Sequence, residues 1–240
     1  MLDLEKELAA AVRHFWTVRG RQEKKQGGKT GRKDTGSRAA VTGGKHGDGF
    51  IALMASIVRD AGIPDANIFI QKKTLPCYFR PSKDWDLIVK VGDDLLAVIE
   101  VKAHVGSFGN NFNNRVEEAL GSATDFWAAY REATFKPSAR PWLGYLIMLE
   151  QAPESTRAGK SKALPHYPMR KEFDGISYAR RYEVFCERLV RERLYDAACF
   201  LMSSEKKGKR GVYSEPSAEL NFRNFATSLS ARAAAFARMK

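Results

Sequence analysis

Residues 83–102 read KDWDLIVKVGDDLLAVIEVK, and this stretch decides the fold. Two apolar runs, LIVKV and LLAVIEV, flank a Gly-Asp-Asp turn, a pattern that predicts a β-hairpin. Asp86 precedes the first run, whereas Glu100 and Lys102 lie two residues apart at the end of the second. Because side chains alternate between the faces of a strand, Glu100 and Lys102 share one face and Val101 points to the other. Strand pairing can bring the carboxylate of Asp86 beside them.

This acid and lysine pattern indicates a metal site. Two carboxylates that face each other repel unless a cation lies between them, so Asp86 and Glu100 favour a hard divalent metal such as Mg²⁺. Lys102 would then orient or help to deprotonate a water, or stabilise the charge that develops on a phosphate. Hairpins with a surface salt bridge satisfy the same spacing. The apolar runs around these charged residues favour the metal site, because buried unpaired acids are costly.

The regions on both sides of the hairpin predict an α/β protein. Apolar residues at helical spacing predict helices over residues 2–19, 48–62, 113–132 and 178–194, and from about residue 217 onward. Further strands are expected at residues 68–71, 75–79, 143–149 and 197–202. Residues 152–173 contain three prolines and no clear period, which indicates a surface excursion.

The charge of the chain points to a polyanionic partner. Lys and Arg number 40 against 28 Asp and Glu, which gives a formal net charge of +12. Nine of these cations lie between Arg19 and Lys45, against two acids. Residues 20–47 are also rich in glycine and poor in large apolar side chains, so we interpret them as a mobile basic segment that binds phosphates through Lys24, Lys25 and Lys45. A solvated linker is the alternative.

Several classes of protein are excluded or disfavoured by composition. No apolar run is long enough to cross a membrane, and the charged start MLDLEKELAA is not a signal peptide. Three scattered cysteines suit a reducing cytoplasm rather than a disulfide framework. The TGGK run lacks the spacing of a phosphate loop, so no nucleotide cofactor is expected. We expect one domain over residues 1–240 that includes the basic segment.

The motifs around Asp86, Glu100 and Lys102 resemble those of a known family. The order of a helix, Asp86 at a strand start, a hairpin, Glu-x-Lys and another helix resembles the PD-(D/E)XK nucleases, with Trp85-Asp86 in place of the usual Pro-Asp. Three stretches are similar to the XhoI-type restriction endonucleases, which cleave the palindrome CTCGAG: AVTGGKHGDGFIALM, RPSKDWDLIV and IEVKAHVGSFGNNFNNRVEEALGSATDFWAAYRE.

The resemblance implies a restriction-endonuclease-like fold, with a central mixed sheet flanked by helices. It also implies that Asp86, Glu100 and the main-chain carbonyl of Val101 bind Mg²⁺, and that Lys102 is the catalytic lysine. The expected activity is that of a homodimeric type II restriction enzyme that hydrolyses double-stranded DNA. A nuclease of DNA repair or junction resolution, with the same chemistry, and a non-catalytic basic DNA-binding protein are the alternatives.

The stretch GSFGNNFNNR at residues 106–115 is the best candidate for contact with bases. Asn side chains pair with adenine edges and Arg with guanine, and glycines let a backbone approach closely. We therefore expect a DNA-facing loop at the start of a helix. Its candidate DNA-binding residues are Asn110, Asn111, Asn113, Asn114 and Arg115. The alternative is an Asn-rich turn in which Asn113 or Asn114 caps the helix.

Two further residues keep two interpretations each. Asp48, at the start of the second helix, is either an N-cap or a further metal ligand. His104 shares the face of Glu100 and Lys102 if that strand continues to residue 104; a strand-end histidine that bonds to backbone is the alternative.

Overall fold

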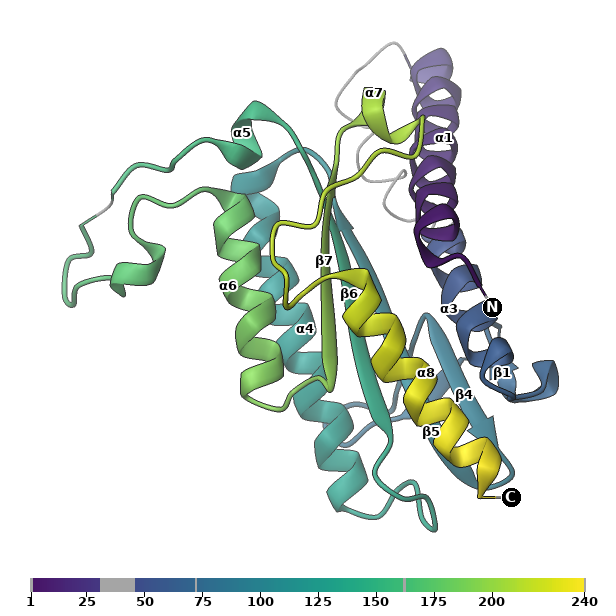
Figure 1. Cartoon of the computed structure of the whole chain (residues 1–240). Coiled ribbons are helices and arrows are strands. Elements are labelled where there is room, and N and C mark those ends of the chain that lie inside the picture. The colour runs from purple at the N-terminus through teal and green to yellow at the C-terminus, as the bar shows by residue number, and fades with distance from the viewer. Residues whose placement is uncertain (1, 31–45, 72, 162, 240) are drawn as a thin grey trace.

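The computed structural model describes residues 2–30, 46–71, 73–161 and 163–239, with the backbone alone for residues 22–30 and Asn110. A five-stranded sheet forms its centre, in the order β1-β4-β5-β6-β7 (Figure 1). Its strands are β1 (Ile68–Phe69), β4 (Leu87–Val91), β5 (Asp94–His104), β6 (Trp142–Glu150) and β7 (Ala197–Ser203). The expected mixed sheet of an α/β protein is confirmed.

The hairpin predicted from the sequence is formed by β4 and β5. The two strands are antiparallel, with Leu87 opposite Ile99 and Val91 opposite Asp94. On its other side, β5 pairs in parallel with β6, which pairs in parallel with β7. Parallel strands require a crossover, and helix α4 (Phe108–Arg131) supplies the one between β5 and β6.

The two strands of the hairpin differ in length, and this difference positions the site. Strand β5 has 11 residues and β4 has 5. Pairing with β4 ends at Ile99, whereas pairing with β6 continues to His104. In the part of the chain that the structure describes, residues 100–104 therefore pair with β6 alone. We call the side of β5 that faces away from β6 here the open edge.

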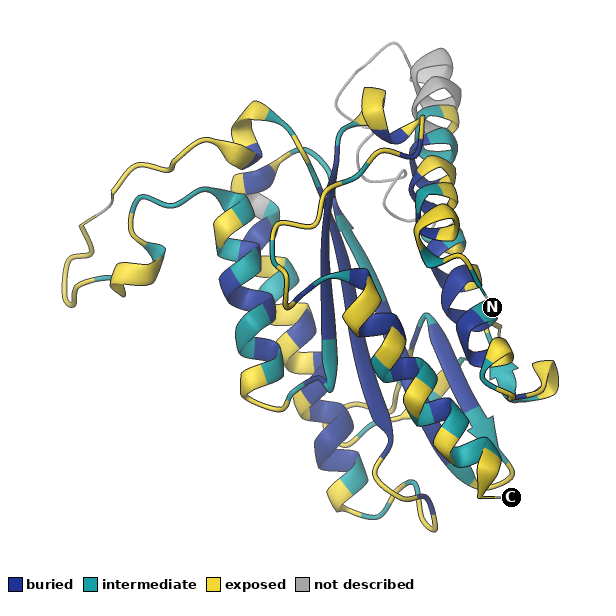
Figure 2. Cartoon of the chain, viewed as in Figure 1, coloured by how far each residue is buried: buried dark blue, intermediate teal, exposed yellow. Residues whose placement is uncertain are grey.

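Helices cover both faces of the sheet in a three-layer arrangement. Helices α1 (Leu4–Thr30), α3 (Asp48–Asp60) and α8 (Phe222–Arg238) pack on one face, and α4 and α6 (Tyr178–Arg191) on the other (Figure 1). Each face has its own buried apolar cluster, and strands β6 and β7 between them are almost fully buried (Figure 2). No helix in the described residues is long and apolar enough to span a bilayer.

A second, two-stranded sheet lies outside the central one. It pairs β2 (Thr74–Pro76) with β3 (Ser82–Asp84) in an antiparallel hairpin. The sequence predicted a strand over residues 75–79, but the observed strand ends at Pro76, and β3 was not predicted. The short lengths of both strands explain the miss, because three residues show no usable period.

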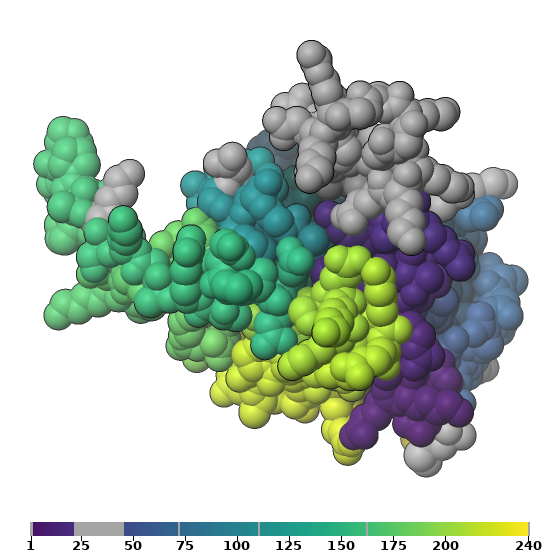
Figure 3. Space-filling view, turned by 90° about the horizontal axis from the view of Figure 1, so that it is seen from above, coloured from purple at the N-terminus to yellow at the C-terminus, as the bar shows by residue number. Residues whose placement is uncertain are grey.

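The remaining elements are short. They are η1 (Asp65–Asn67), α5 (Pro153–Thr156), η2 (Lys171–Phe173) and α7 (Glu205–Gly208). The segment between α5 and α6 is mostly exposed and stands off from the body when viewed from above (Figure 3). This confirms the surface excursion expected at residues 152–173.

Three helix boundaries differ from the prediction by five residues or more. Helix α1 continues to Thr30 instead of ending near Arg19, so residues 20–30 are helical rather than a loop. The prediction treated a lack of apolar residues as a sign of a loop, but Arg, Gln, Glu and Lys favour helix without burial. Residues 31–45, including Lys45, lie outside the described residues.

Helices α4 and α8 begin five residues from their predicted starts, in opposite directions. Helix α4 begins at Phe108 after Ser107, which has a positive φ of 46°. The Asn-rich stretch therefore forms its first turns, and neither Asn113 nor Asn114 is its N-cap. Helix α8 begins at Phe222, where the side chain of Asn221 accepts a hydrogen bond from the Asn224 N–H. Local capping geometry decides both ends, and periodicity does not show it.

Candidate active site

Asp86 lies immediately before β4 and turns its carboxylate to the open edge of β5. Its N–H donates to the Ile99 carbonyl at 3.1 Å, and its Oδ2 accepts from the Val101 N–H at 2.7 Å. Asp86 thus satisfies a strand amide that β4 is too short to reach. Because the N–H and C=O of one strand residue point to the same side, the Val101 carbonyl faces this edge too.

Glu100 is buried between two lysines. Its side chain is 4 % exposed, and Lys102 from the same face of β5 forms a close ion pair with Oε1. The Nζ of Lys83, on β3, lies 3.0 Å from Oε2. This Oε2 accepts no hydrogen bond of good geometry from the described residues. The shared face of Glu100 and Lys102 is the one predicted from the alternation of side chains.

A third lysine lies beside Asp86. The Nζ of Lys73 is 3.5 Å from Oδ1 of this residue. Neither Lys73 nor Lys83 was predicted from the sequence. Lys83 is part of the quoted motif, three residues before Asp86, so a charge count in that motif could have drawn attention to it. Lys73 carries no local signal, because only the β2–β3 hairpin brings it to the site.

These contacts set the protonation of the site. Burial, and then the charge of Glu100, raise the pKa of Asp86, although the Val101 N–H and the lysines act against this. Burial alone would lower the pKa of Lys102, but the ion pair and hydrogen bond with Glu100 outweigh it and raise the pKa. Lys102 is therefore an ammonium group at neutral pH in this arrangement, suited to balancing negative charge rather than to accepting a proton.

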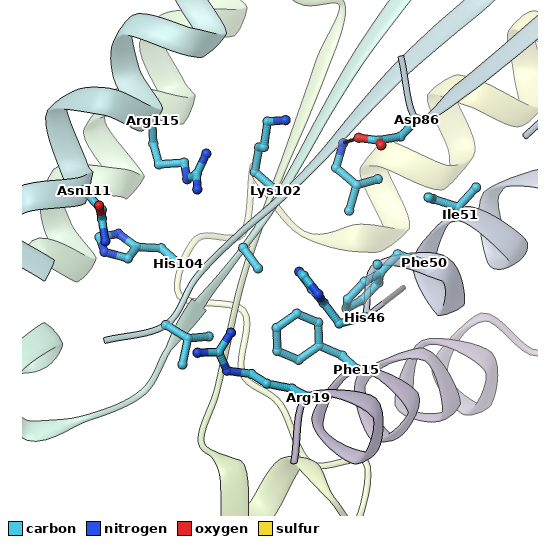
Figure 4. A pocket seen from close by; sticks show the side chains of 14 residues that line it. Phe15, Arg19, His46, Phe50, Ile51, Asp86, Lys102, His104, Asn111 and Arg115 are labelled. Carbon is cyan, nitrogen blue, oxygen red and sulfur yellow. Dashed lines mark hydrogen bonds between the residues drawn. The ribbon is translucent and has the colours of Figure 1, made fainter. Parts of the chain in front are cut away.

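Two hollows meet at Lys102. A cleft of about 220 Å³ at the open edge lies between α4 and the pair α1 and α3 (Figure 4). Asp86, Lys102, His104, Arg115 and Asn111 line it, together with Arg19, His46 and Phe15, which were not predicted from the sequence. A second hollow of about 540 Å³ reaches Glu100 and Lys83. Lys102 and Arg115 line both, so a phosphate at Lys102 would have access to both carboxylates.

The structure separates the predicted DNA-binding residues into groups. Asn111 and Arg115 line the cleft, and Arg115 also pairs with Glu118. Asn113 and Asn114 are exposed on α4. For Asn110, Lys24 and Lys25 only the helical backbone is described. The expected loop is instead the first part of a helix, which presents its side chains on a more rigid support.

Asp48 is exposed outside the cleft, whereas His104 is buried and lines it. Asp48 is exposed, follows the N-cap Gly47, and is not one of the described residues that line the cleft. The N-cap prediction is therefore off by one residue. Strand β5 does continue to His104, whose Nδ1 lies 2.6 Å from the hydroxyl of Tyr182. Burial, with the charge of Arg115, lowers the pKa of His104 to about 4, so its ring is uncharged at neutral pH.

Known proteins similar in sequence to this chain identify its family. A family model described as restriction endonuclease XhoI matches residues 25–215. The chain belongs to this family. It is 50 % identical over 204 residues to type II restriction enzyme BstVI of Geobacillus stearothermophilus, covering 82 % of this chain and 91 % of that one. It is 43 % identical over 188 residues to type II restriction enzyme XhoI of Xanthomonas vasicola, covering 75 % and 72 %.

A third relative is type II restriction enzyme AbrI of Azospirillum brasilense, 44 % identical over 170 residues, covering 70 % of this chain and 75 % of that one. No solved structure matches the chain. The resemblance seen in the sequence motifs is thus confirmed at the level of the family.

Type II restriction enzymes generally use divalent metal ions, and the oxygen donors at the open edge of β5 fit such an ion. The Asp86 and Glu100 carboxylates and the Val101 carbonyl are hard oxygen donors. Oε2 of Glu100 is buried and, among the described residues, has the ion pair with Lys83 but no hydrogen bond of good geometry. Among the described residues no group of three or more His, Cys, Asp and Glu could hold a metal. Two carboxylates suit Mg²⁺, which keeps several waters and binds substrate phosphate oxygens.

Proposed function

We propose that the protein is a sequence-specific endonuclease that cuts double-stranded DNA at CTCGAG by Mg²⁺-dependent hydrolysis, with a PD-(D/E)XK site. One observation carries the proposal: Asp86, Glu100 and Lys102 converge at the open edge of β5 in a chain of the XhoI family. We take residues 1–240 as one domain, because both apolar clusters share the central sheet.

Each residue of the site has a distinct task in this proposal. Asp86, Glu100 and the Val101 carbonyl would hold Mg²⁺, which when bound supplies Lewis acidity and lowers the pKa of a coordinated water. Lys102, as an ammonium group, stabilises the negative charge that grows on the phosphate during in-line attack. Arg115, which lines both hollows, adds a second cation beside that phosphate. A water attacks the phosphorus in line and the bond from phosphorus to the 3′ oxygen breaks. The leaving oxygen takes up a proton, so the products are a 3′-hydroxyl and a 5′-phosphate.

We assign DNA binding to two sets of residues. Asn110, Asn111, Asn113 and Asn114, in the first turns of α4, would pair with base edges. Lys24, Lys25 and Lys45 contribute sequence-independent contacts to phosphates. A palindromic site is matched most simply by a two-fold dimer in which each subunit cuts one strand.

A plasmid digest tests this function. A circular plasmid with one CTCGAG site should be converted to a single linear product in Mg²⁺, with no product in EDTA. A plasmid in which this site is changed at one base pair is the matched control and should stay uncut. Full activity in EDTA would contradict the metal requirement. A smear in place of one band would point to a nuclease of repair or junction resolution, and retained binding without cleavage in Mg²⁺ would point to a non-catalytic protein.

A further inference from the structure

The β2–β3 hairpin supplies two of the three lysines at the site. Lys73 directly precedes β2 and Lys83 lies within β3. The Trp85 N–H donates to the Lys73 carbonyl at 3.0 Å, so the pairing of the hairpin extends to the level of the site. One small element thus places an ammonium group on Asp86 and another on Glu100.

The tip of this hairpin is fixed to α4 by Asp125. The Oδ1 atom of Asp125 accepts from the Tyr78 and Phe79 N–H groups at 2.8 and 2.9 Å, and Oδ2 accepts from Arg80 Nε at 2.7 Å. The Asp125 side chain is 5 % exposed. Charge-assisted hydrogen bonds to a buried carboxylate are strong, and the loss of any one donor leaves the buried charge less well satisfied. Asp125 therefore fixes the tip of the hairpin against α4.

Lys83 is held on several sides. Its side chain is 12 % exposed, and besides Glu100 its Nζ reaches the Asp84 carbonyl at 3.2 Å. The same atom lies 4.6 Å from the centre of the buried Trp85 ring, within range of a cation–π interaction. A surface ion pair has none of these supports, and its two long side chains stay free to move. Lys83 is therefore fixed where a cation at Glu100 would lie.

The carboxylates and lysines at the site together carry a net positive charge before any divalent ion binds. Asp86 and Glu100 carry two negative charges, and Lys73, Lys83 and Lys102 carry three positive ones. A divalent ion added to this arrangement would meet a group that is already net positive. It can bind only if an ammonium leaves a carboxylate or if a DNA phosphate brings further negative charge.

We propose that Lys83 is a positioning residue that holds Glu100 in the metal-free protein and competes with the divalent ion for this carboxylate. The inference rests on the function proposed above. Lys83 gives up Glu100 when the ion binds, and a DNA phosphate in the second hollow then balances the released ammonium. The divalent ion consequently binds weakly to the free protein and more tightly to the DNA complex. Little of the enzyme therefore carries the ion before DNA is bound.

Calorimetric titration of the full-length, DNA-free protein with Ca²⁺ tests this competition. Lys83→Met removes the charge and keeps the length of the side chain, and it should bind Ca²⁺ about tenfold more tightly or better. Lys83→Arg keeps the charge and should bind like the parent protein. Lys90→Met is the matched control, since Lys90 lies on β4 at the far end from Asp86 and pairs with Asp93 at 3.7 Å.

Thermal unfolding separates competition from a merely structural role. Without metal, Lys83→Met should unfold at a lower temperature, because Glu100 loses a buried partner, yet Ca²⁺ should raise its midpoint more than that of the parent. Lys83→Gln serves in the same titration if the Met variant does not fold. Unchanged or weaker Ca²⁺ affinity in the neutral variants would overturn the inference. If the parent also fails to cut the plasmid in Mg²⁺, the proposed function itself is wrong.

Discussion

The two halves of β5 differ in their neighbours and in their chemistry. Residues 95–99 lie along β4 on one side, and residues 97–99 also pair with β6 on the other. All five are buried and apolar. Residues 100–104 do not pair with β4, and they include Glu100, Lys102 and His104. Where the neighbouring strand stops, the backbone groups of β5 must find other partners. Asp86 provides one, and the same gap admits a ligand.

This comparison explains why the site is at this position in the sheet. A fully paired strand offers side chains on its two faces, whereas the open edge also offers main-chain groups such as those of Val101. In the open half, residues 100–104, Lys102 remains partly accessible beside the buried Glu100, while the closed half, residues 95–99, supplies the rigid apolar support. Function and stability should therefore divide between the two halves.

The largest effect is expected for the carboxylates of the open half. Asp86→Asn or Glu100→Gln should lower the rate of cleavage on the order of 10³-fold or more, since each removes a negative charge that would hold the divalent ion. Specific DNA binding measured in Ca²⁺ should remain close to that of the parent. A rate within about tenfold of the parent, measured in single turnovers, would mean that the wrong carboxylate has been chosen.

In the closed half, substitution should affect folding instead. Leu96 is 1 % exposed on β5, and Leu96→Ala should lower the free energy of unfolding by about 2–5 kcal/mol, because it weakens the packing and leaves a cavity. The cleavage rate per folded molecule, measured well below the unfolding midpoint, should be unchanged. Denaturant titration measures the free energy of unfolding, and single-turnover cleavage with a known amount of folded protein measures the rate per folded molecule. A large loss of rate in fully folded protein would contradict the division between the halves.

The helix that follows the open half should affect sequence discrimination. Asn113→Ala or Asn114→Ala should cost about 1–3 kcal/mol of discrimination against altered sites for each bidentate pairing with a base that the substitution removes. Binding of CTCGAG and of single-base variants in Ca²⁺ measures this difference. Glu132→Ala, an exposed position at the far end of the same helix, is the control. Equal weakening on all sequences would show that these residues contact phosphates instead.

The basic residues of α1 should affect the affinity for all DNA sequences alike, together with its salt dependence. Replacing Lys24 and Lys25 by Ala should flatten the plot of log affinity against log salt by roughly 0.9 unit for each phosphate that is no longer neutralised, equally for specific and unrelated DNA. Arg at both positions keeps the charge and should preserve the slope. If the slope stays the same in the Ala variant, the cations that neutralise phosphates must be sought elsewhere, such as in the excursion between α5 and α6.

The smallest effect is a pH-dependent gain in stability. Because burial and the charge of Glu100 raise the pKa of Asp86 in the folded protein, its ionisation destabilises the metal-free fold at pH values above that raised pKa. Asp86→Asn should therefore unfold at a higher temperature than the parent at pH values above that raised pKa, and the difference should shrink as the pH falls through it toward the ordinary value of 3.8. Asp93→Asn, in the exposed turn of the same hairpin, should show no such trend.

Local patterns were sufficient for much of the fold and for the centre of the site. The β4–β5 hairpin, the common face of Glu100 and Lys102, and the positions of α3 and β6 follow from alternation and helical spacing over short stretches. Helix ends at Thr30, Phe108 and Phe222 were missed, because capping and the propensity of polar residues act without an apolar period.

The sequence by itself therefore determined the hairpin, the acid and lysine motif and the family to which the chain belongs, because each depends on residues close together along the chain. Only the tertiary structure decided that β4 stops short of Glu100, that Lys73 and Lys83 reach the carboxylates, and that His104 is buried against Tyr182. These contacts join residues from separate elements, and their formation depends on how the sheet, the small hairpin and the helices pack together.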